Sequence, residues 1–430
     1  MHTQAAADPT ASRQSTVRTA FAGVIGNVLE WFDFAVFGYF STEIGASFFP
    51  GSSPGAQQLK AFMVFALGFA ARPIGSLVLG PVGDRIGRRA LLTLSIAVMG
   101  GATLLIGFLP TYAQVGFLAP VLLASLRMIQ GFSLGGEFTG SMVYTTELAS
   151  PLMRGLVSSS TAAGTTLGFI LGSATSALLR NHLDEAQRLS WGWRVPFIIS
   201  VVLCIAGWLL RRGLRESEEG EKAAAARPPL WSSLAGDWRP MLQTFGIVAL
   251  TNALYYLTFT FAGEYRKSHP VPDQPDFQSI NTMMLFVVLF SKPLGGWLSD
   301  KVGRRRMMLI LTVAMMVLFY FAFGMMAHGS GRDFMLGQLL MGVPLGLALG
   351  LQGAMVVEIF PLRTRVTSMS LAYSVTLVLA GGLAPLIASW LIDNQHQPLI
   401  AVYYYTLIYA VIGLVAMLPM KETNQLALNH

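Results

Sequence analysis

A charged stretch of ten residues that occurs twice, half a chain apart, constrains the fold more than any other feature of this sequence. It reads Gly80-Pro-Val-Gly-Asp-Arg-Ile-Gly-Arg-Arg89 in the first half and Gly296-Trp-Leu-Ser-Asp-Lys-Val-Gly-Arg-Arg305 in the second. Each copy lies between long apolar runs, and the two copies are 216 residues apart in a chain of 430. A charged turn that returns at half-length between apolar segments predicts a duplicated bundle of membrane helices.

The composition is typical of a membrane protein. Hydrophobic residues make up 53% of the chain and charged residues 12%, with a mean hydropathy of +0.56, whereas an average soluble domain has about 25% charged residues. A spanning helix needs about 20 mostly apolar residues, and a helix satisfies its own backbone hydrogen bonds in lipid. The sequence therefore predicts an all-α membrane protein with twelve transmembrane helices. The runs that qualify are 20–41, 60–81, 90–110, 115–145, 155–180, 194–211, 241–264, 279–298, 307–327, 334–358, 367–392 and 400–419.

The placement of lysine and arginine predicts the orientation in the membrane. With the N-terminus in the cytoplasm, 19 of the 29 basic residues fall in cytoplasmic segments and 6 in external loops. This is the positive-inside bias of membrane proteins. It also accounts for the net charge of +7 without a nucleic-acid partner. We therefore expect a multi-pass protein with both termini in the cytoplasm.

The chain divides at a hydrophilic stretch near its middle. Residues 211–240 are rich in charge and contain Arg-Pro-Pro, a composition that favours a loop over a span. We expect this stretch to be a cytoplasmic linker between an N-terminal six-helix bundle, residues 1–210, and a C-terminal six-helix bundle, residues 241–430.

Further motifs resemble one family of transporters. Span 1 reads GNVLEWFDFAVFG over residues 26–38, span 4 reads RMIQGFSLGGE over 127–137, and span 6 is preceded by WGWRVPF over 191–197. Together with the two charged turns, these motifs resemble the metabolite:proton symporter family of the major facilitator superfamily. The members of that family carry proline and betaine, citrate, 2-oxoglutarate or shikimate. The resemblance covers essentially the whole chain, and span 7 and the C-terminal end look most like the proline/betaine members.

This resemblance implies two pseudo-symmetric bundles that alternate access to a central site, in the inner membrane of a bacterium. The implied activity is import of a small carboxylate-bearing solute, either a zwitterion or an organic acid, coupled to protons. We expect a monomer whose partners are the solute, protons and the bilayer, driven by the proton gradient without a bound cofactor. Neither a phosphate-binding loop nor a His-Glu-x-x-His motif is present, and Cys204 is the single cysteine. We therefore predict neither an enzyme nor a metal site.

Two other functions are compatible with the same fold. A drug or cation:proton antiporter would favour a more apolar binding pocket with fewer balanced charges. A membrane receptor that does not transport would bind its ligand without uptake.

Charged residues inside spans indicate a proton-coupling site. A charge at the centre of a bilayer costs at least about 2.5–3.5 kcal/mol and usually faces a cavity or a partner. Glu30 and Asp33 are three residues apart and share a helix face. A carboxylate that alternates between an apolar setting and an ion pair with arginine can bind and release a proton. We expect Glu30 or Asp33 to carry the proton, with Arg127 as the competing cation and Glu137 in the same layer. A permanent structural network of ion pairs is the alternative.

A second set of residues in the spans is predicted to bind the solute. Two cations in spans 2 and 8 suit a substrate carboxylate, and the aromatic rings of span 7 suit a cationic headgroup. The alternatives are an ion pair of Arg72 with Glu30 or Glu137, and simple core packing of the aromatic rings. The predicted contacts are Arg72, Lys292, Asn252, Tyr255, Tyr256 and Tyr373.

A third set of residues flanks the loops at one end of the bundle. Glu147 precedes Arg154 by seven residues, and Glu358 precedes Arg365 by the same distance in the second half. Together with the charged turns, these pairs are predicted from the resemblance to form a conformational latch. Plain anchoring of the loops by arginine is the alternative, but it leaves the aspartates unexplained. The latch set is Asp84, Arg88, Glu147, Arg154, Asp300, Arg304, Glu358 and Arg365.

Overall fold

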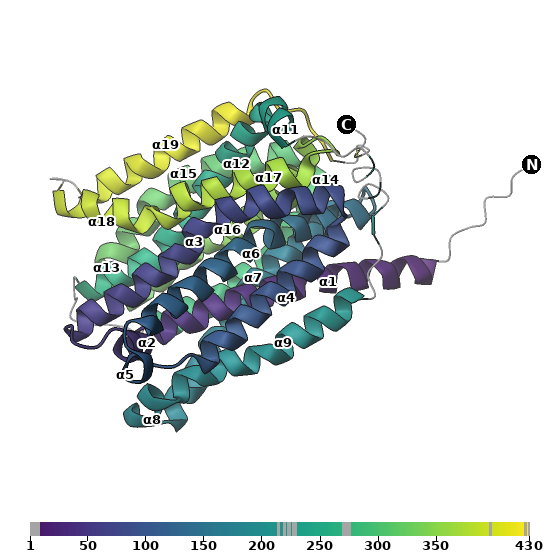
Figure 1. Ribbon diagram of the computed structural model, residues 1–430. Helices are drawn as coiled ribbons and strands as arrows, with labels where there is room; N and C mark the ends of the chain where they lie inside the picture. Colours follow the sequence, from purple (N-terminus) through teal and green to yellow (C-terminus); the bar gives the residue numbers. More distant parts are fainter. Residues whose placement is uncertain are drawn as a thin grey trace, which may run out of the picture.

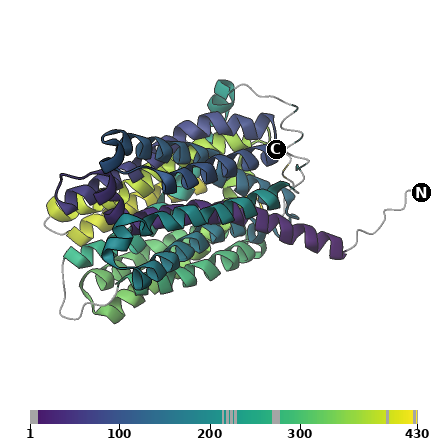
Figure 2. The ribbon, with the colours of Figure 1, turned by 60° about the horizontal axis from the view of Figure 1, so that its bottom comes forward.

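The computed structural model describes residues 9–212, 230–268, 277–394 and 398–424, together with 216, 217, 221, 225 and 428. In this part of the chain the regular structure is entirely helical, and the long helices run side by side (Figures 1 and 2). The first half contains α1 (Pro9–Tyr39), α2 (Ser41–Phe48), α3 (Pro54–Arg85), α4 (Arg88–Phe108), α5 (Tyr112–Val115), α6 (Leu118–Leu148), α7 (Arg154–His182), α8 (Glu185–Ser190), the 3-10 turn η1 (Gly192–Arg194) and α9 (Val195–Arg212). The second half contains α11 (Leu230–Gly236), α12 (Trp238–Tyr256), η2 (Leu257–Phe261), α13 (Ala262–Ser268), α14 (Phe277–Val302), α15 (Arg304–His328), α16 (Gly331–Ile359), α17 (Arg365–Thr376), η3 (Leu377–Gly382), α18 (Ala384–Asn394) and α19 (Pro398–Met417).

Each of the twelve predicted spans is helical. Eleven helices in the described part of the chain are long and apolar enough to cross a bilayer, and α1 covers the first predicted span. The predicted linker, 211–240, lies partly outside the described residues, and its described part includes the end of α9, helix α11 and the start of α12. The boundaries of the two bundles therefore stay a prediction.

Two spans contain a π-helical turn that the sequence did not indicate. The turn η2 follows α12 in span 7, and the turn η3 follows α17 in span 11. Such turns widen a helix by one residue and occur often at functional sites. Turn η3 packs against the end of α12, directly before η2, because a Cβ on Gly381 in η3 would lie 3.0 Å from the ring of Tyr256. The irregular turn of span 11 therefore contacts span 7 just before the irregular turn of that span begins.

The two halves of the chain meet along two pairs of long helices. Helix α7 packs along α14, and α3 packs along α17. At the first of these contacts the backbones touch, because a Cβ on Gly155 would lie only 2.3 Å from the carbonyl oxygen of Gly296. Helix α1 begins, and α19 ends, at the end of the bundle that carries the charged turns (Figure 1). We call this the loop-motif end.

Candidate functional site

A central cavity lies between the two halves of the chain, and its walls come from nine helical segments. Both halves contribute to it, with α1, α3, α6 and α7 on one side and α12, α14, α16, α17 and η3 on the other. All six residues that the sequence analysis predicted as solute contacts line this one cavity. The lining residues are Trp31, Arg72, Phe138, Met142, Ala162, Thr165, Asn252, Tyr255, Tyr256, Lys292, Leu349, Gln352, Tyr373 and Leu377.

Lys292 reaches from α14 across to α7 of the other half. Its side chain is buried, and the residue is only 3% exposed. The ammonium donates hydrogen bonds to the carbonyl oxygen of Ala162 at 2.7 Å, to the Thr165 hydroxyl at 3.1 Å and to the Thr166 hydroxyl at 2.7 Å. No carboxylate of the described residues lies within 4.0 Å of this ammonium. Lys292 is thus a buried cation whose three partners are all neutral.

Arg72 is paired with Glu30 while it lines the cavity. Its Nη2 lies 2.9 Å from Glu30 Oε1, which is the ion pair that the sequence analysis gave as an alternative. The pair is single-pronged. In the described part of the chain, Glu30 Oε2 and two nitrogens of the Arg72 guanidinium have no hydrogen-bond partner although all are buried. The pair therefore has unused hydrogen-bonding capacity beside the cavity.

Asp33 belongs to a different and more complete network. It forms an ion pair with Arg127 and also accepts a hydrogen bond from Gln130 Nε2 at 3.0 Å. Gln130 in turn donates to the Thr103 hydroxyl at 2.7 Å, and the Arg127 guanidinium stacks 3.7 Å from the ring centroid of Phe37. Neither Asp33 nor Arg127 lines the central cavity. The two acids of span 1 thus bind separate arginines.

Glu137 has a partner that the sequence analysis did not identify. Its carboxylate accepts hydrogen bonds from Arg211 Nη1 at 3.1 Å and from Arg211 Nη2 at 2.5 Å. Arg211 was counted with the hydrophilic stretch after span 6, but it lies in the last turn of α9 and is fully buried. A basic residue at the end of an apolar helix was the available signal. Glu137 is therefore held in a two-pronged pair away from the cavity wall.

The remaining cavity wall is aromatic and uncharged. The Thr251 hydroxyl donates to Gln352 Oε1 at 2.6 Å, and Gln352 Nε2 donates to the Tyr373 hydroxyl at 3.3 Å. The rings of Tyr255 and Tyr256 pack edge to face, 5.9 Å apart. Sequence reasoning did not identify Trp31 and the other hydrophobic residues of the wall, because apolar residues in spans carry no signal of their own. Such a wall suits an apolar or quaternary group of a solute.

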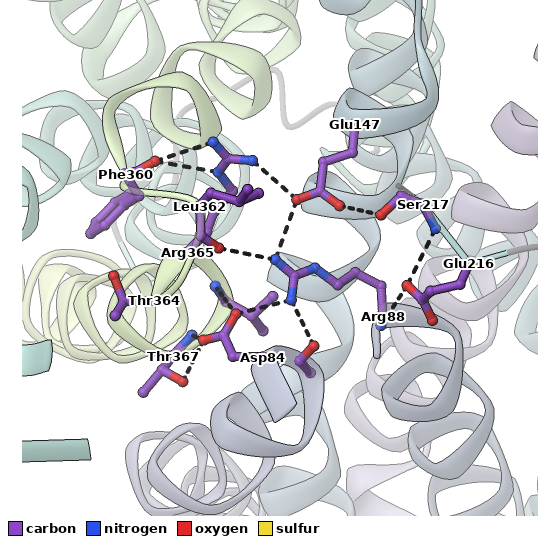
Figure 3. Close-up of polar contacts among 12 residues, drawn as sticks. Asp84, Arg88, Glu147, Glu216, Ser217, Phe360, Leu362, Thr364, Arg365 and Thr367 are labelled. Carbon is purple, nitrogen blue, oxygen red and sulfur yellow. Dashed lines mark hydrogen bonds and ion pairs between the residues drawn. The ribbon is translucent and has the colours of Figure 1, made fainter. Parts of the chain in front are cut away.

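Four of the latch residues, Asp84, Arg88, Glu147 and Arg365, lie around the start of α17 at the loop-motif end (Figure 3). Asp84, in the last turn of α3, accepts hydrogen bonds from the backbone N–H of Val366 at 3.1 Å and of Thr367 at 2.8 Å. It also pairs with Arg88 at 3.1 Å. An acid at a helix N-terminus is favourable because it meets unpaired N–H groups. Asp84 therefore joins the first half of the chain to the second.

Glu147 makes a second connection between the halves. Its carboxylate forms ion pairs with Arg365 of α17 at 3.0 Å and with Arg88 of α4 at 3.3 Å (Figure 3). It also accepts a hydrogen bond from the Ser217 hydroxyl at 2.6 Å. Arg88 also donates to the carbonyl oxygen of Leu362 at 3.4 Å. The two predicted sets of latch residues thus interlock, since Arg365 belongs to the second set.

The second aspartate repeats this geometry on the other pair of helices. Asp300 accepts hydrogen bonds from the backbone N–H groups of Gly155 at 2.8 Å and of Leu156 at 2.9 Å, at the start of α7. It pairs with Arg304 at 2.7 Å, and Arg304 pairs with Glu358 at 3.0 Å. Arg154, the first residue of α7, is buried beside this aspartate's partners. All eight predicted latch residues therefore lie at the loop-motif end, although their role in transport stays a prediction.

Two further glutamates take part in this end of the bundle. Glu216 accepts the backbone N–H groups of Arg88 at 2.9 Å and of Arg89 at 3.0 Å. The Glu422 carboxylate accepts hydrogen bonds from the backbone N–H groups of residues 304–306 at 2.6, 3.3 and 3.4 Å. Each acid caps a helix that begins directly after a glycine with positive φ, 121° at Gly87 and 109° at Gly303. The signal in the sequence was a Glu followed by Ser or Thr shortly after the last helix of each half.

Among the residues that the structure describes, no group of three His, Cys, Asp or Glu side chains could hold a metal ion.

Comparisons with known proteins agree with this architecture. Residues 19–228 match the family model for sugar (and other) transporters, and residues 272–428 match that of the major facilitator superfamily. The chain is 35% identical over 416 residues to the proline/betaine transporter of Escherichia coli K12, covering 94% of this chain and 83% of that one. It is 38% identical over 418 residues to the inner membrane metabolite transport protein YhjE of the same organism, covering 95% and 94% of the two chains. The structure of a proton:xylose symporter superposes with a TM-score of 0.78 at 18% identity, covering 97% and 98%.

Proposed function

Because this chain belongs to the major facilitator superfamily and is a multi-pass membrane transporter, not an enzyme, we propose that it imports a small carboxylate-bearing solute together with protons. The solute binds in the central cavity, and the two halves of the chain rock around it to expose the cavity to one side of the membrane at a time.

The observation that carries this proposal is the composition of the cavity wall. Two cationic side chains, Arg72 and Lys292, come from opposite halves and line the same cavity. A guanidinium offers a planar pair of donors and an ammonium a compact point charge, and both are suited to a carboxylate. The aromatic and aliphatic residues of the wall suit the apolar body of a small solute. A carboxylate that bridges the two cations contacts both halves.

Two classes of solute fit this wall. Zwitterions are supported by the names of relatives, which are proline/betaine transporters, and by the rings of Tyr255 and Tyr256, since aromatic faces bind quaternary ammonium groups. Organic acids such as citrate or 2-oxoglutarate are supported by Lys292, because its ammonium has only neutral partners.

For the coupling proton we propose Glu30. The sequence analysis left Glu30 and Asp33 as alternatives. Both oxygens of Asp33 have partners, whereas Glu30 Oε2 has no hydrogen-bond partner among the described residues. Among the residues that the structure describes, the cation that binds Glu30 is Arg72, which lines the cavity. A solute carboxylate that binds Arg72 weakens the Glu30 pair, and a buried carboxylate without a cation takes up a proton.

The loop-motif end is proposed to face the cytoplasm of a bacterial cell, in line with the bias of lysine and arginine. The latch contacts of Asp84 and Asp300 hold the halves together at this end. Breaking them opens the cavity to the cytoplasm, and forming them returns it to the outside. A single chain contains both halves, so we propose that a monomer is sufficient.

Uptake by purified protein in liposomes tests the proposal. Radiolabelled proline, betaine, citrate, 2-oxoglutarate and shikimate are offered with and without an inward proton gradient. We expect accumulation of one class of solute, stimulated by the gradient. Accumulation without any effect of the gradient would contradict proton coupling but not import. Binding of cationic drugs with no uptake of any carboxylate would favour a drug:proton antiporter, and binding of a carboxylate without uptake would favour a receptor.

A further inference from the structure

The charges around the cavity do not balance. Lys292 differs from three other cations that are buried in the spans of the described bundle, because each of those has a carboxylate partner. The pairs are Arg72 with Glu30, Arg127 with Asp33, and Arg211 with Glu137. Each pair is neutral as a unit, so the positive charge of Lys292 is left over.

The oxygens around Lys292 solvate its charge without cancelling it. An ammonium has three N–H donors, and all three find acceptors in α7, namely one carbonyl and two hydroxyls. The hydrogen-bonding capacity is therefore used, while the net charge remains. A buried charge without a counter-charge is unfavourable, and the unfavourable energy is removed when an anion enters the cavity beside it.

The wall offers nothing negative to a positively charged solute group. None of the fourteen lining residues in the described part of the chain is an aspartate or a glutamate. A zwitterion therefore brings a cationic group close to Arg72 and Lys292 with no acid in the wall to receive it. Only aromatic faces and neutral oxygens are available, and their attraction for a cation is weaker than that of a carboxylate. A monoanion of the same shape meets the same wall without this repulsion.

We propose that Lys292 determines the charge of the transported solute, so that the cavity prefers a monoanionic carboxylate to a zwitterion of equal size. This inference rests on the proposed function, because it assumes that the solute carboxylate binds in the central cavity. It assigns the preference to one side chain. The solute carboxylate lies beside the Lys292 ammonium, while Thr165 and Thr166 keep that ammonium oriented from the opposite half.

Pairs of solutes that differ only in charge test the proposal. Betaine and 3,3-dimethylbutanoate have nearly the same shape, with a carbon in place of the quaternary nitrogen. Proline and tetrahydrofuran-2-carboxylate differ by an ether oxygen in place of the ring ammonium. Binding to the purified full-length protein is measured by calorimetry. For at least one pair we expect the anion to bind at least about 10-fold more tightly than the zwitterion, because the like charges repel.

Variants of Lys292 connect this preference to the side chain. Lys292→Met keeps the length and removes the charge, and we expect the anion-to-zwitterion ratio to fall to about 1 or below. Lys292→Arg keeps the charge, and the ratio should stay above 1 even if both affinities decrease. Lys301→Met is the matched control, because Lys301 lies on the same helix, is exposed and does not line the cavity. Its ratio should equal that of the wild type.

The outcomes separate this inference from the proposed function. Tighter binding of the zwitterions to the wild type would overturn the inference, as would an unchanged ratio in Lys292→Met, and import of a carboxylate would still stand. If Lys292→Met does not fold, the affinity ratios of the wild type and of Lys292→Arg still test the inference. Loss of the preference for the anion in Lys292→Arg, which keeps the positive charge, would contradict it. Binding of none of the four compounds would overturn the inference, whereas the proposed function is decided separately by the liposome panel, which includes citrate, 2-oxoglutarate and shikimate.

Discussion

The carboxylate of Asp84 accepts two hydrogen bonds from Thr367, one from its backbone N–H at 2.8 Å and one from its hydroxyl at 2.6 Å. The two residues are 283 positions apart in the chain. This contact ties the end of α3 to the start of α17, and it places a negative charge where helix α17 has unpaired N–H groups. It is one of the direct links between the two halves at the loop-motif end, together with the contacts of Asp300 and of Glu147.

Asp84→Asn should open this end of the bundle. The amide removes the charge and directs a donor toward the N–H groups, and hydrogen bonds to a charged group contribute about 1.5–3 kcal/mol each. Loss of one such contribution shifts the equilibrium toward the open state about 10- to 100-fold. The measurement is the alkylation rate of Ser370→Cys, at a fully buried position of α17 that contacts Thr139 of the other half, in a protein that also carries Cys204→Ser.

Asp333→Asn is the matched control for this labelling. Asp333 also lies in the first turn of a helix, but at the opposite end of the bundle, and it accepts two hydrogen bonds from Ser330 of its own cap. Its labelling rate should equal that of the wild type. Equal rates in Asp84→Asn and the wild type would show that Asp84 does not hold the halves together.

Glu147 and Arg365 should be energetically coupled across the halves. Removing one partner of a buried pair leaves an uncompensated charge and destabilises a protein by about 3–5 kcal/mol. We expect Glu147→Gln and Arg365→Met each to lower the free energy of unfolding. The loss in the double variant should be smaller than the sum of the two single losses by about 1–3 kcal/mol. Unfolding in mixed micelles gives the four free energies. Additive effects would mean that the 3.0 Å contact contributes no coupling.

Glu30→Gln should separate transport from the proton gradient. If Glu30 carries the proton, a glutamine mimics the protonated form permanently, so uptake no longer responds to the gradient. We expect stimulation by an inward gradient to fall to about 1-fold, while exchange of labelled for unlabelled solute persists. Glu137→Gln is the comparison, since that acid is bound twice by Arg211 away from the cavity. A variant Glu30→Gln that still accumulates solute with the gradient would refute this role.

Glu216 and Glu422 should stabilise the helices they cap. A capping acid contributes about 0.5–2 kcal/mol through its hydrogen bonds and its charge at the helix N-terminus. Glu216→Gln and Glu422→Gln should each lower the melting temperature in detergent. The effect of Glu422→Gln should be at least as large, because it accepts from three N–H groups. Glu221→Gln, at an exposed position of the same linker, should have no effect, and a drop of equal size there would point to a general charge effect.

The sequence predicted the spans and the positions of most buried charges, because both depend on local patterns. Runs of apolar residues define twelve helices, and the i,i+4 spacing within each charged turn brings Asp84 to Arg88 and Asp300 to Arg304. The convergence of six predicted residues on one cavity was also foreseeable, since a charge inside a span must face a partner or a cavity.

The partners of these charges were harder to predict, because they depend on distant and often neutral groups. The acceptors of Lys292 are a carbonyl and two hydroxyls on α7, and threonine in a helix gives no sign of binding a cation. Arg211 looked like a loop residue because it follows an apolar run. The two capping glutamates lie outside any periodic segment. Only the repetition of Glu with Ser or Thr after each half would have revealed them.

The capping glutamates also determine the order in which contacts become possible while the chain is being synthesised. Glu216 binds N–H groups that lie 127 and 128 residues before it, within the same half of the chain. The first half can therefore complete its own loop-motif contacts before α12 exists, in keeping with the early folding of N-terminal units during translation. The residues that donate to Asp84, by contrast, are synthesised 282 and 283 residues after it. The connection between the halves is consequently among the last parts of the molecule that can assemble.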